Sequence, residues 1–203
     1  MIGPETPRRT VLRSALAATG TAALGVALAA CGDKDSLSEQ ANSGSDKGYI
    51  AGDGVVTQLP PSKRGHPVEA GGKLLNGKHF DLADWRGNIL VLNLWYAACP
   101  PCRKEAKDVE AAYRAYKDKG VRFLGVNVRD GAAAAKSYMR TFDITYPVML
   151  DTAGRVVSAL HGVLPPEATP STLLLDPKGR IAGRVVGEVD KTTLKGMIGD
   201  LRT

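Results

Sequence analysis

The feature that most constrains this chain is a pair of cysteines placed directly after an apolar segment. Residues 89–95, ILVLNLW, are almost entirely apolar, a pattern typical of a strand that is buried on both faces. Cys99 and Cys102 follow, separated by Pro100 and Pro101. Proline suits the first positions of a helix, where no amide partner is needed. We therefore expect the cysteines at a strand-to-helix junction, where the helix N-terminus stabilises a thiolate and favours redox chemistry.

The first thirty residues have the pattern of an export signal. Arg8, Arg9 and Arg13 precede residues 14–30, which carry no charge and are mostly small or apolar. A basic start, an apolar middle and small residues before a cleavage site are typical of a secretory signal, and the paired arginines resemble a twin-arginine signal. A single membrane-spanning anchor is the alternative, although the segment is close to the lower length limit for a span. We assign residues 1–30 to a signal peptide.

Cys31 stands where the apolar run ends, and the Leu-Ala-Ala before it resembles the lipobox of bacterial lipoproteins. In those proteins the cysteine becomes the first residue and its sulfur carries a diacylglycerol, and two acyl chains hold a protein durably on a bilayer. A free thiol or an intermolecular disulfide is the alternative for Cys31. Residues 31–60 are rich in Asp, Ser, Gly and Lys, so we expect a flexible tether.

Residues 61–203 are long enough for one hydrophobic core. Glycine-rich turns at 71–72 and 76–77 predict a hairpin, and 81–85 predicts a helical turn before the first buried strand. The further expected elements are a helix from 100 to Gly120, strands at 121–128 and 146–150, helices at 131–142 and 154–160, antiparallel strands at 171–175 and 180–186, and a helix at 192–201 capped by Asp190. Strand, helix and strand in succession imply a right-handed parallel crossover. The order predicts an α/β fold with a mixed central sheet flanked by helices.

Charge and cysteine content exclude several classes of function. The net charge is +6, without a run of Lys and Arg interleaved with aromatic residues, so nucleic acid is not an expected partner. The chain has three cysteines, and with Cys31 assigned to lipid, one pair remains. A loop as short as that between Cys99 and Cys102 removes little unfolded-state entropy. The pair therefore favours disulfide exchange over structural stapling.

Four short motifs carry a resemblance to a known family. They are NLW at 93–95, CPPCRKE at 99–105, VNV at 126–128 and TPST at 169–172. They resemble the TlpA/ResA-type thioredoxin-fold thiol–disulfide oxidoreductases, which are extracytoplasmic and membrane-tethered and of which several serve cytochrome c maturation. The resemblance covers about residues 61–203. It implies a thioredoxin-like fold with a helix–strand insert at 131–150, to which the N-terminal hairpin predicted above is added, and we expect no cofactor.

Three residues are the candidate catalytic groups. Cys99, at the helix start, is the expected attacking sulfur, and Cys102, one turn on and more buried, is expected to resolve the mixed disulfide. Plain thioredoxin has a buried Asp where this chain has Asn93, which cannot accept a proton. The resemblance implies that Glu105 helps Cys102 to ionise instead. The alternative for Glu105 is a solvated acid near the start of a helix, where the dipole favours it.

The candidate substrate-binding residues are Thr169, Pro170 and Trp95. The resemblance implies a cis Thr169–Pro170 bond that faces the two sulfurs, although a trans turn is the ordinary alternative. Trp95 is expected to pack beneath the site, with a docking role as a further prediction. Ala98 departs from the family, which commonly has Trp directly before the first cysteine, so partner docking is expected to differ.

Other functions fit the sequence less well. Zinc would need more ligands than one cysteine pair, covalent haem would need His at Arg103, and copper delivery or a simple binding domain is the non-enzyme alternative. His66, His79 and His161 receive no role, and we assign no metal. A redoxin-type peroxidase or antioxidant protein would have Pro and Thr before the cysteine, where residues 96–98 are Tyr-Ala-Ala.

We therefore expect a thiol–disulfide oxidoreductase that is lipid-anchored through Cys31 on the outer face of the cytoplasmic membrane. The predicted direction is reduction of disulfides in exported proteins, with a disulfide-forming oxidase as the enzymatic alternative. A membrane electron donor would restore the dithiol. The resemblance implies apocytochrome c as a client.

Overall fold

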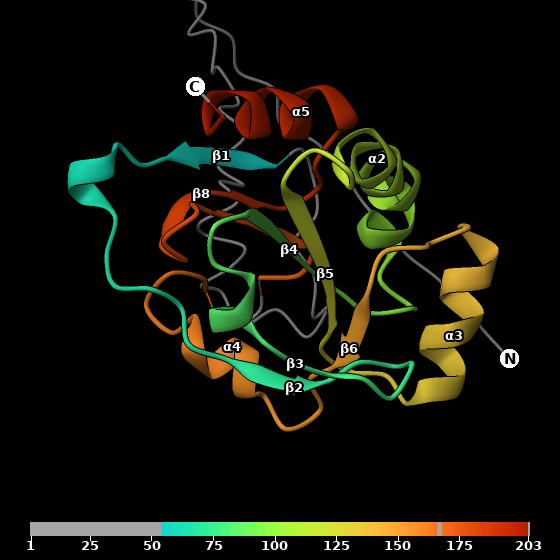
Figure 1. The fold of residues 1–203 in the computed structure, drawn as a ribbon. Helices are drawn as coiled ribbons and strands as arrows, with labels where there is room; N and C mark the ends of the chain where they lie inside the picture. The colour runs from blue at the N-terminus through green and yellow to red at the C-terminus, as the bar shows by residue number, and fades with distance from the viewer. Residues whose placement is uncertain (1–53, 166–167, 203) are drawn as a thin grey trace, which may run out of the picture. The chain divides into compact units, whose positions relative to one another are not determined.

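A mixed six-stranded sheet forms the centre of the computed structural model, which describes residues 54–165 and 168–202 (Figure 1). The strand order is β1-β8-β7-β4-β5-β6. The strands are β1 (Val55–Gln58), β4 (Ile89–Trp95), β5 (Val121–Asn127), β6 (Val148–Leu150), β7 (Ser171–Leu175) and β8 (Ile181–Val186). Strands β4, β5 and β6 are parallel, whereas β7 runs antiparallel to β4, β8 to β7 and β1 to β8. The predicted mixed sheet is confirmed.

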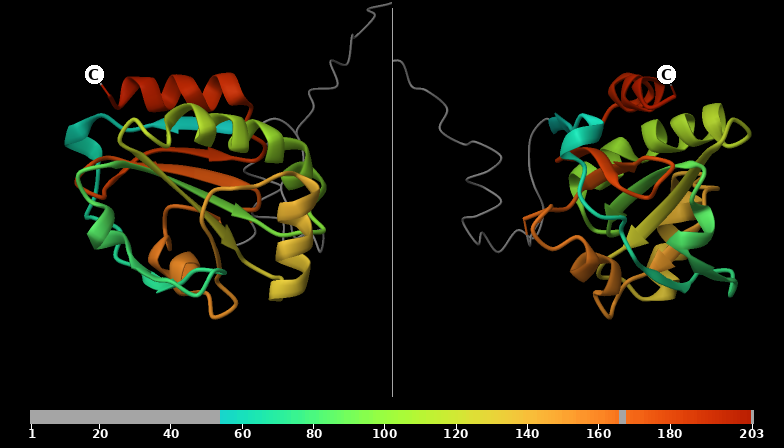
Figure 2. Two further views of the ribbon diagram at one scale, coloured as in Figure 1. Left: turned by 45° about the vertical axis from the view of Figure 1, so that its right-hand side comes forward. Right: turned by 60° about the vertical axis from the view of Figure 1, so that its left-hand side comes forward.

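Helices lie on both faces of this sheet. They are α2 (Pro100–Tyr116), α3 (Ala132–Thr141), α4 (Arg155–Ala159) and α5 (Lys191–Asp200), with 3-10 turns η1 (Pro61–Lys63) and η2 (Leu82–Trp85). Figure 2 shows α2 and α5 together on one face, with α4 and the hairpin on the other. The hairpin consists of β2 (Gly71–Lys73) and β3 (His79–Asp81), which pair antiparallel. The helix–strand insert predicted at residues 131–150 is present as α3 and β6.

Strand β4 contributes side chains to two hydrophobic cores, because helices cover both faces of the sheet. All seven of its residues are buried. The side chains that belong to the core beneath α2 and α5 are Ile89, Val91 and Trp95. Those in the core on the α4 side are Leu90, Leu92 and Leu94. Burying such a side chain contributes about 1.5–3 kcal/mol, so β4 is fixed in register and its last residue is held at the edge of the sheet from which the cysteines follow.

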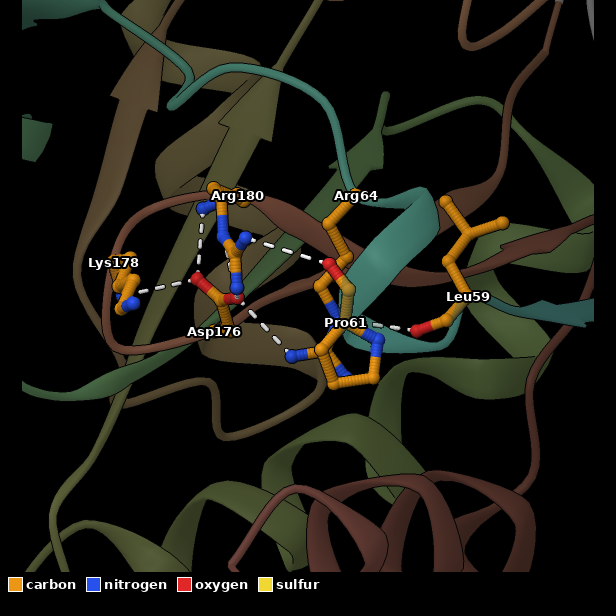
Figure 3. A network of polar contacts seen from close by, with 6 residues as sticks. All are labelled: Leu59, Pro61, Arg64, Asp176, Lys178 and Arg180. Atoms are coloured by element: carbon orange, nitrogen blue, oxygen red, sulfur yellow. Dashed lines mark hydrogen bonds and ion pairs between the residues drawn. The ribbon is translucent and has the colours of Figure 1, made fainter.

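A buried carboxylate ties the N-terminal part of the described chain to the β7–β8 turn (Figure 3). Asp176 accepts hydrogen bonds from Arg180 Nη2 at 2.7 Å and from Arg64 Nη1 at 3.1 Å. Arg64 also donates to the carbonyl of Leu59, and Arg180 to that of Pro61. Burial alone would raise the pKa of Asp176, but the hydrogen bonds from Arg180 and Arg64 hold it below its ordinary value. The ionised carboxylate therefore fastens the segment after β1 to the sheet.

The structure corrects two expectations about the N-terminal part. Residues 55–58, which the sequence assigned to the tether, form β1, and Val55 pairs with Val186. Val55 and Val56 are 47% and 44% exposed, so the strand lacks the buried pattern that would have revealed it. Gly71 and Gly72 lie within β2 rather than in a turn.

The signal peptide, Cys31 and most of the tether lie outside the described residues. Among the residues that are described, no helix combines the length and the apolar character needed to cross a membrane.

Candidate active site

Cys99 and Cys102 form a disulfide at the start of α2, with an S–S distance of 2.03 Å. Cys99 is the N-cap of the helix, and its Sγ accepts the backbone N–H of Cys102 at 3.2 Å. Pro100 and Pro101 occupy the first helical positions, as the sequence predicted. The unpaired amides of this first turn place positive partial charge next to Cys99. The site can therefore stabilise a Cys99 thiolate once the disulfide is reduced.

Both cysteines are buried in this oxidised state. Cys99 and Cys102 are each 0% exposed, so the expectation that Cys102 is the more buried of the two is wrong here. Ala98 and Pro100, on either side of Cys99, are exposed. The buried disulfide is thus flanked by exposed residues, and the sulfur of Cys99 lies against the first turn of α2.

Polar groups from the loop after β5 hold the segment that leads into Cys99. Asp130 Oδ2 accepts the backbone N–H of Ala97 at 2.6 Å and the Nδ2 of Asn127 at 2.7 Å. From the other side, Arg103 Nη1 donates to the Ala97 carbonyl at 3.3 Å. Sequence reasoning missed Asp130. The available signal was that β4 and β5, as parallel neighbours, end at the same edge of the sheet, so polar residues after β5 can reach the loop after β4.

Glu105 is buried one helical turn after Cys102, on the same side of α2. It is 2% exposed, so the alternative of a solvated acid is wrong. Its Oε1 accepts the Nδ2 of Asn93 at 2.8 Å, and its Oε2 accepts the backbone N–H of Val189 at 2.9 Å. Asn93 Nδ2 also donates to Thr172 Oγ1 at 3.1 Å. The carboxyl group is therefore held by the sheet through Asn93, by the segment between β8 and α5 through Val189, and by its own helix.

Burial raises the pKa of Glu105 to about 8. The hydrogen bonds from Asn93 and Val189 lower the pKa in part, while the negative charges of Glu188 and Asp108 raise it further. A carboxyl group with this pKa is mostly protonated at pH 7 and exchanges its proton near neutral pH. Its part in the reaction stays a prediction.

The Thr169–Pro170 peptide bond is cis, which confirms that expectation, and the Pro170 carbonyl accepts the backbone N–H of Gly187 at 2.9 Å. Thr169 lines a cavity of about 380 Å³ together with Leu94 and Val128, from the ends of β4 and β5. His161, which received no role from the sequence, also lines this cavity. The predicted placement of the proline opposite the sulfurs stays a prediction.

Aromatic residues of the insert contact the strand and the helix that carry the cysteines. Tyr138 of α3 stacks on Trp95 with 4.2 Å between ring centroids, and its hydroxyl donates to the Cys102 carbonyl at 2.6 Å. Trp95 is 1% exposed, so it packs inside the domain as predicted but offers no docking surface in this state. Gly125 leaves room for it, because a Cβ there would lie 3.0 Å from Trp95 Nε1. Sequence reasoning missed Tyr138.

Within the described parts of the chain, no group of three or more His, Cys, Asp or Glu side chains is placed to hold a metal ion.

A dithiol at the junction of a central strand and a helix, beside a buried acid, defines the class of thioredoxin-fold thiol–disulfide oxidoreductases. The AhpC/TSA family profile matches residues 68–184, more than half of the chain, and the chain belongs to this family as a ResA-like thiol–disulfide oxidoreductase. The thiol–disulfide oxidoreductase ResA of Bacillus thuringiensis subsp. konkukian is 31% identical over 121 residues, which cover 60% of this chain and 68% of the relative.

Solved structures show the same fold. A DsbF homologue from Corynebacterium diphtheriae matches with a TM-score of 0.63 at 29% identity, covering 72% of this chain and 92% of that chain. A secreted thiol-disulfide isomerase from Corynebacterium glutamicum matches with a TM-score of 0.67 at 26% identity, covering 72% of this chain and 90% of that one. The predicted thioredoxin-like fold is confirmed.

The raised pKa of Glu105 predicts a pH dependence of stability. In the unfolded chain Glu105 ionises near the ordinary pKa of 4.5, whereas burial in the folded protein raises this pKa to about 8. The folded state therefore binds more protons across this window, and its stability falls as pH rises through it. We predict that, from about pH 4.5 to about pH 8, the free energy of unfolding of the wild type falls relative to that of Glu105→Gln.

Denaturant unfolding of the oxidised protein at several pH values measures this difference. Asp118→Asn, which removes an exposed carboxylate elsewhere on the surface, is the control for a simple change of net charge. Parallel stability curves for the wild type and Glu105→Gln would show that Glu105 is not held protonated.

Proposed function

We propose that this oxidoreductase reduces disulfides in exported proteins. The observation that carries the proposal is the Cys99–Cys102 pair at the N-terminus of α2, with the buried carboxyl group of Glu105 one turn further along the helix. The first sulfur lies where a thiolate is stabilised, and the second lies near a group that can exchange a proton. Such a pair suits two successive thiolate attacks.

The reaction begins with the reduced dithiol. The Cys99 thiolate attacks one sulfur of a client disulfide, forming a mixed disulfide and releasing the other client sulfur as a thiolate. The Cys102 thiolate then attacks Cys99 Sγ, which closes the disulfide seen here and releases the second client sulfur. Two electrons pass to the client, and the protons lost by Cys99 and Cys102 balance those taken up by the two client thiolates.

Glu105 is proposed to take the proton of Cys102 before the second attack, acting through its ionised form, which is the minor form at pH 7 and about half of the population near pH 8. A carboxylate whose pKa is raised to about 8 is a stronger base than an ordinary carboxylate, so it is better matched to taking a proton from a thiol. Asn93 and Val189 hold the two carboxyl oxygens in place. In this proposal Asn93 only orients the carboxyl group, and Glu105 of α2 is the proton acceptor.

Clients are proposed to bind along Thr169 and Pro170, with a side chain in the neighbouring cavity. The cavity is lined by apolar side chains from the ends of β4 and β5 and by polar groups that include Arg129 and His161. Ala98 is small and exposed next to Cys99, so it adds little bulk beside the redox turn where a client would dock. Apocytochrome c is the proposed client class, because its cysteine pair must be reduced before haem attachment.

The trapping of clients tests these assignments. We predict that Cys102→Ala accumulates mixed disulfides through Cys99, because the resolving attack is lost, and that Cys99→Ala accumulates none. Non-reducing gels of cells that produce each variant provide the measurement, and mass spectrometry identifies the trapped chains. Equal trapping by both variants would contradict the order of attack, and trapped proteins without any c-type cytochrome would contradict the proposed client.

The protein is proposed to act outside the cytoplasmic membrane, anchored by lipid on Cys31 and supplied with electrons by a membrane donor. The apolar segment and the Leu-Ala-Ala-Cys sequence support this proposal, and the Corynebacterium glutamicum neighbour is described as secreted. We predict that Cys31→Ser moves the protein from the membrane fraction to the soluble fraction, with Ser36→Ala in the same tether as the control. Membrane retention of Cys31→Ser would contradict the lipid anchor.

A further inference from the structure

Tyr138 makes a contact with the redox turn that the exchange reaction described above does not use. The residue lies on α3, in the segment between β5 and β6 (Figure 1), and is 4% exposed. Its hydroxyl donates to the carbonyl of Cys102 at 2.6 Å. A buried hydroxyl costs free energy unless it is hydrogen-bonded, so this contact also fixes the position of the Tyr138 ring relative to α2.

The accepting carbonyl belongs to the peptide unit between Cys102 and Arg103, whose N–H is directed toward Cys99. The N–H of that unit is the backbone N–H of Arg103, which donates to the Cys99 carbonyl at 3.1 Å. A hydrogen bond to one end of a peptide unit polarises it and strengthens the positive charge at the other end. The Tyr138 hydroxyl therefore adds to the field that the first turn of α2 exerts on Cys99.

Two aromatic residues contact Tyr138. Its ring stacks on Trp95, the last residue of β4, with an interplanar angle of 24°. Phe142 contacts the same ring at a tilt of 51°, with 4.7 Å between ring centroids, and the Arg103 guanidinium lies 5.0 Å from the Phe142 ring. We call Trp95, Tyr138, Phe142 and Arg103 the aromatic clamp. It connects the residues just before and just after the cysteine pair through one helix of the insert.

We propose that Tyr138 is a positioning residue for thiol–disulfide exchange, which anchors the first turn of α2 through the Cys102 carbonyl and thereby stabilises the Cys99 thiolate. The hydroxyl is the group that matters, because a phenyl ring alone could supply the stacking on Trp95. Burial raises the pKa of Tyr138 well above its ordinary value, and the nearby charge of Glu105 raises it further, while Arg103 lowers it. The hydroxyl thus remains a donor throughout the working pH range.

The proposal rests on the thiol–disulfide activity and on the reactivity of Cys99, but not on the direction in which electrons flow in the cell. Stabilising the Cys99 thiolate favours the dithiol over the disulfide, whether the protein reduces or oxidises its clients. A failure of the proposed reductase direction would therefore leave the role of Tyr138 intact, and the two can be tested separately.

Tyr138→Phe in the reduced full-length chain is the decisive variant, because it keeps the ring and removes the hydroxyl. We expect the pH midpoint of Cys99 alkylation by iodoacetamide, followed by mass spectrometry at that residue, to rise by about half a unit. This corresponds to about a threefold loss of thiolate stabilisation, within the range of one hydrogen bond. The equilibrium with glutathione is expected to move about threefold toward the disulfide, a shift of about 14 mV to a more negative potential.

Two further variants separate the hydroxyl from packing. Tyr113→Phe removes a hydroxyl from α2 itself, at a ring that contacts Phe123 edge-on at 5.5 Å, and is expected to keep the wild-type midpoint and potential. Phe142→Leu loosens the clamp but retains the hydroxyl of Tyr138, and is expected to shift the midpoint by less than Tyr138→Phe does.

Two results would overturn the proposal. One is a wild-type midpoint and potential in Tyr138→Phe, whatever its melting temperature, because a purely structural role would change only stability. The other is an equal shift in Tyr138→Phe and Phe142→Leu, because the ring packing rather than the hydrogen bond would then set the reactivity of Cys99.

Discussion

The chemistry of this chain depends on the positive end of α2 lying against the sulfur of Cys99. That position exists because β4 is buried on both faces and cannot slide, so the chain leaves the sheet at a fixed point and enters the helix within five residues. The Asp130 carboxylate holds the intervening loop by its backbone at Ala97. The sulfur of Cys99 is consequently placed by the sheet and the loop together rather than by the disulfide alone.

Two adjacent environments favour opposite charge states. The first turn of α2 favours a thiolate at Cys99, whereas burial one turn later favours a protonated Glu105. Asn93 is consistent with this division, because it fills the position under the helix with an amide that can hold the Glu105 carboxyl group but cannot itself take up a proton. In the proposed reaction, the attacking sulfur and the proton acceptor are thereby separate groups of the same helical segment.

Local patterns predicted the parts of this structure that depend on neighbouring residues. The apolar run of β4, the prolines that begin α2 and the cap at Asp190 were all visible in the sequence, and each is present. Strand β1 was missed because its partner is β8, far along the chain. Asp130 and Tyr138 were missed for the same reason, since each acts on a backbone group of a distant segment. Burial of Cys99 depends on packing that no local pattern reveals.

The reduction potential of the Cys99–Cys102 couple, equilibrated in a defined glutathione buffer, tests the central proposal most directly. Thioredoxin has a potential of about −270 mV and the strong oxidant DsbA about −120 mV, a difference of about 7 kcal/mol. For a reductase of exported disulfides that a membrane donor recharges, we predict a value near that of thioredoxin. A value near that of DsbA would show that the protein inserts disulfides into its clients, and would contradict the proposed direction.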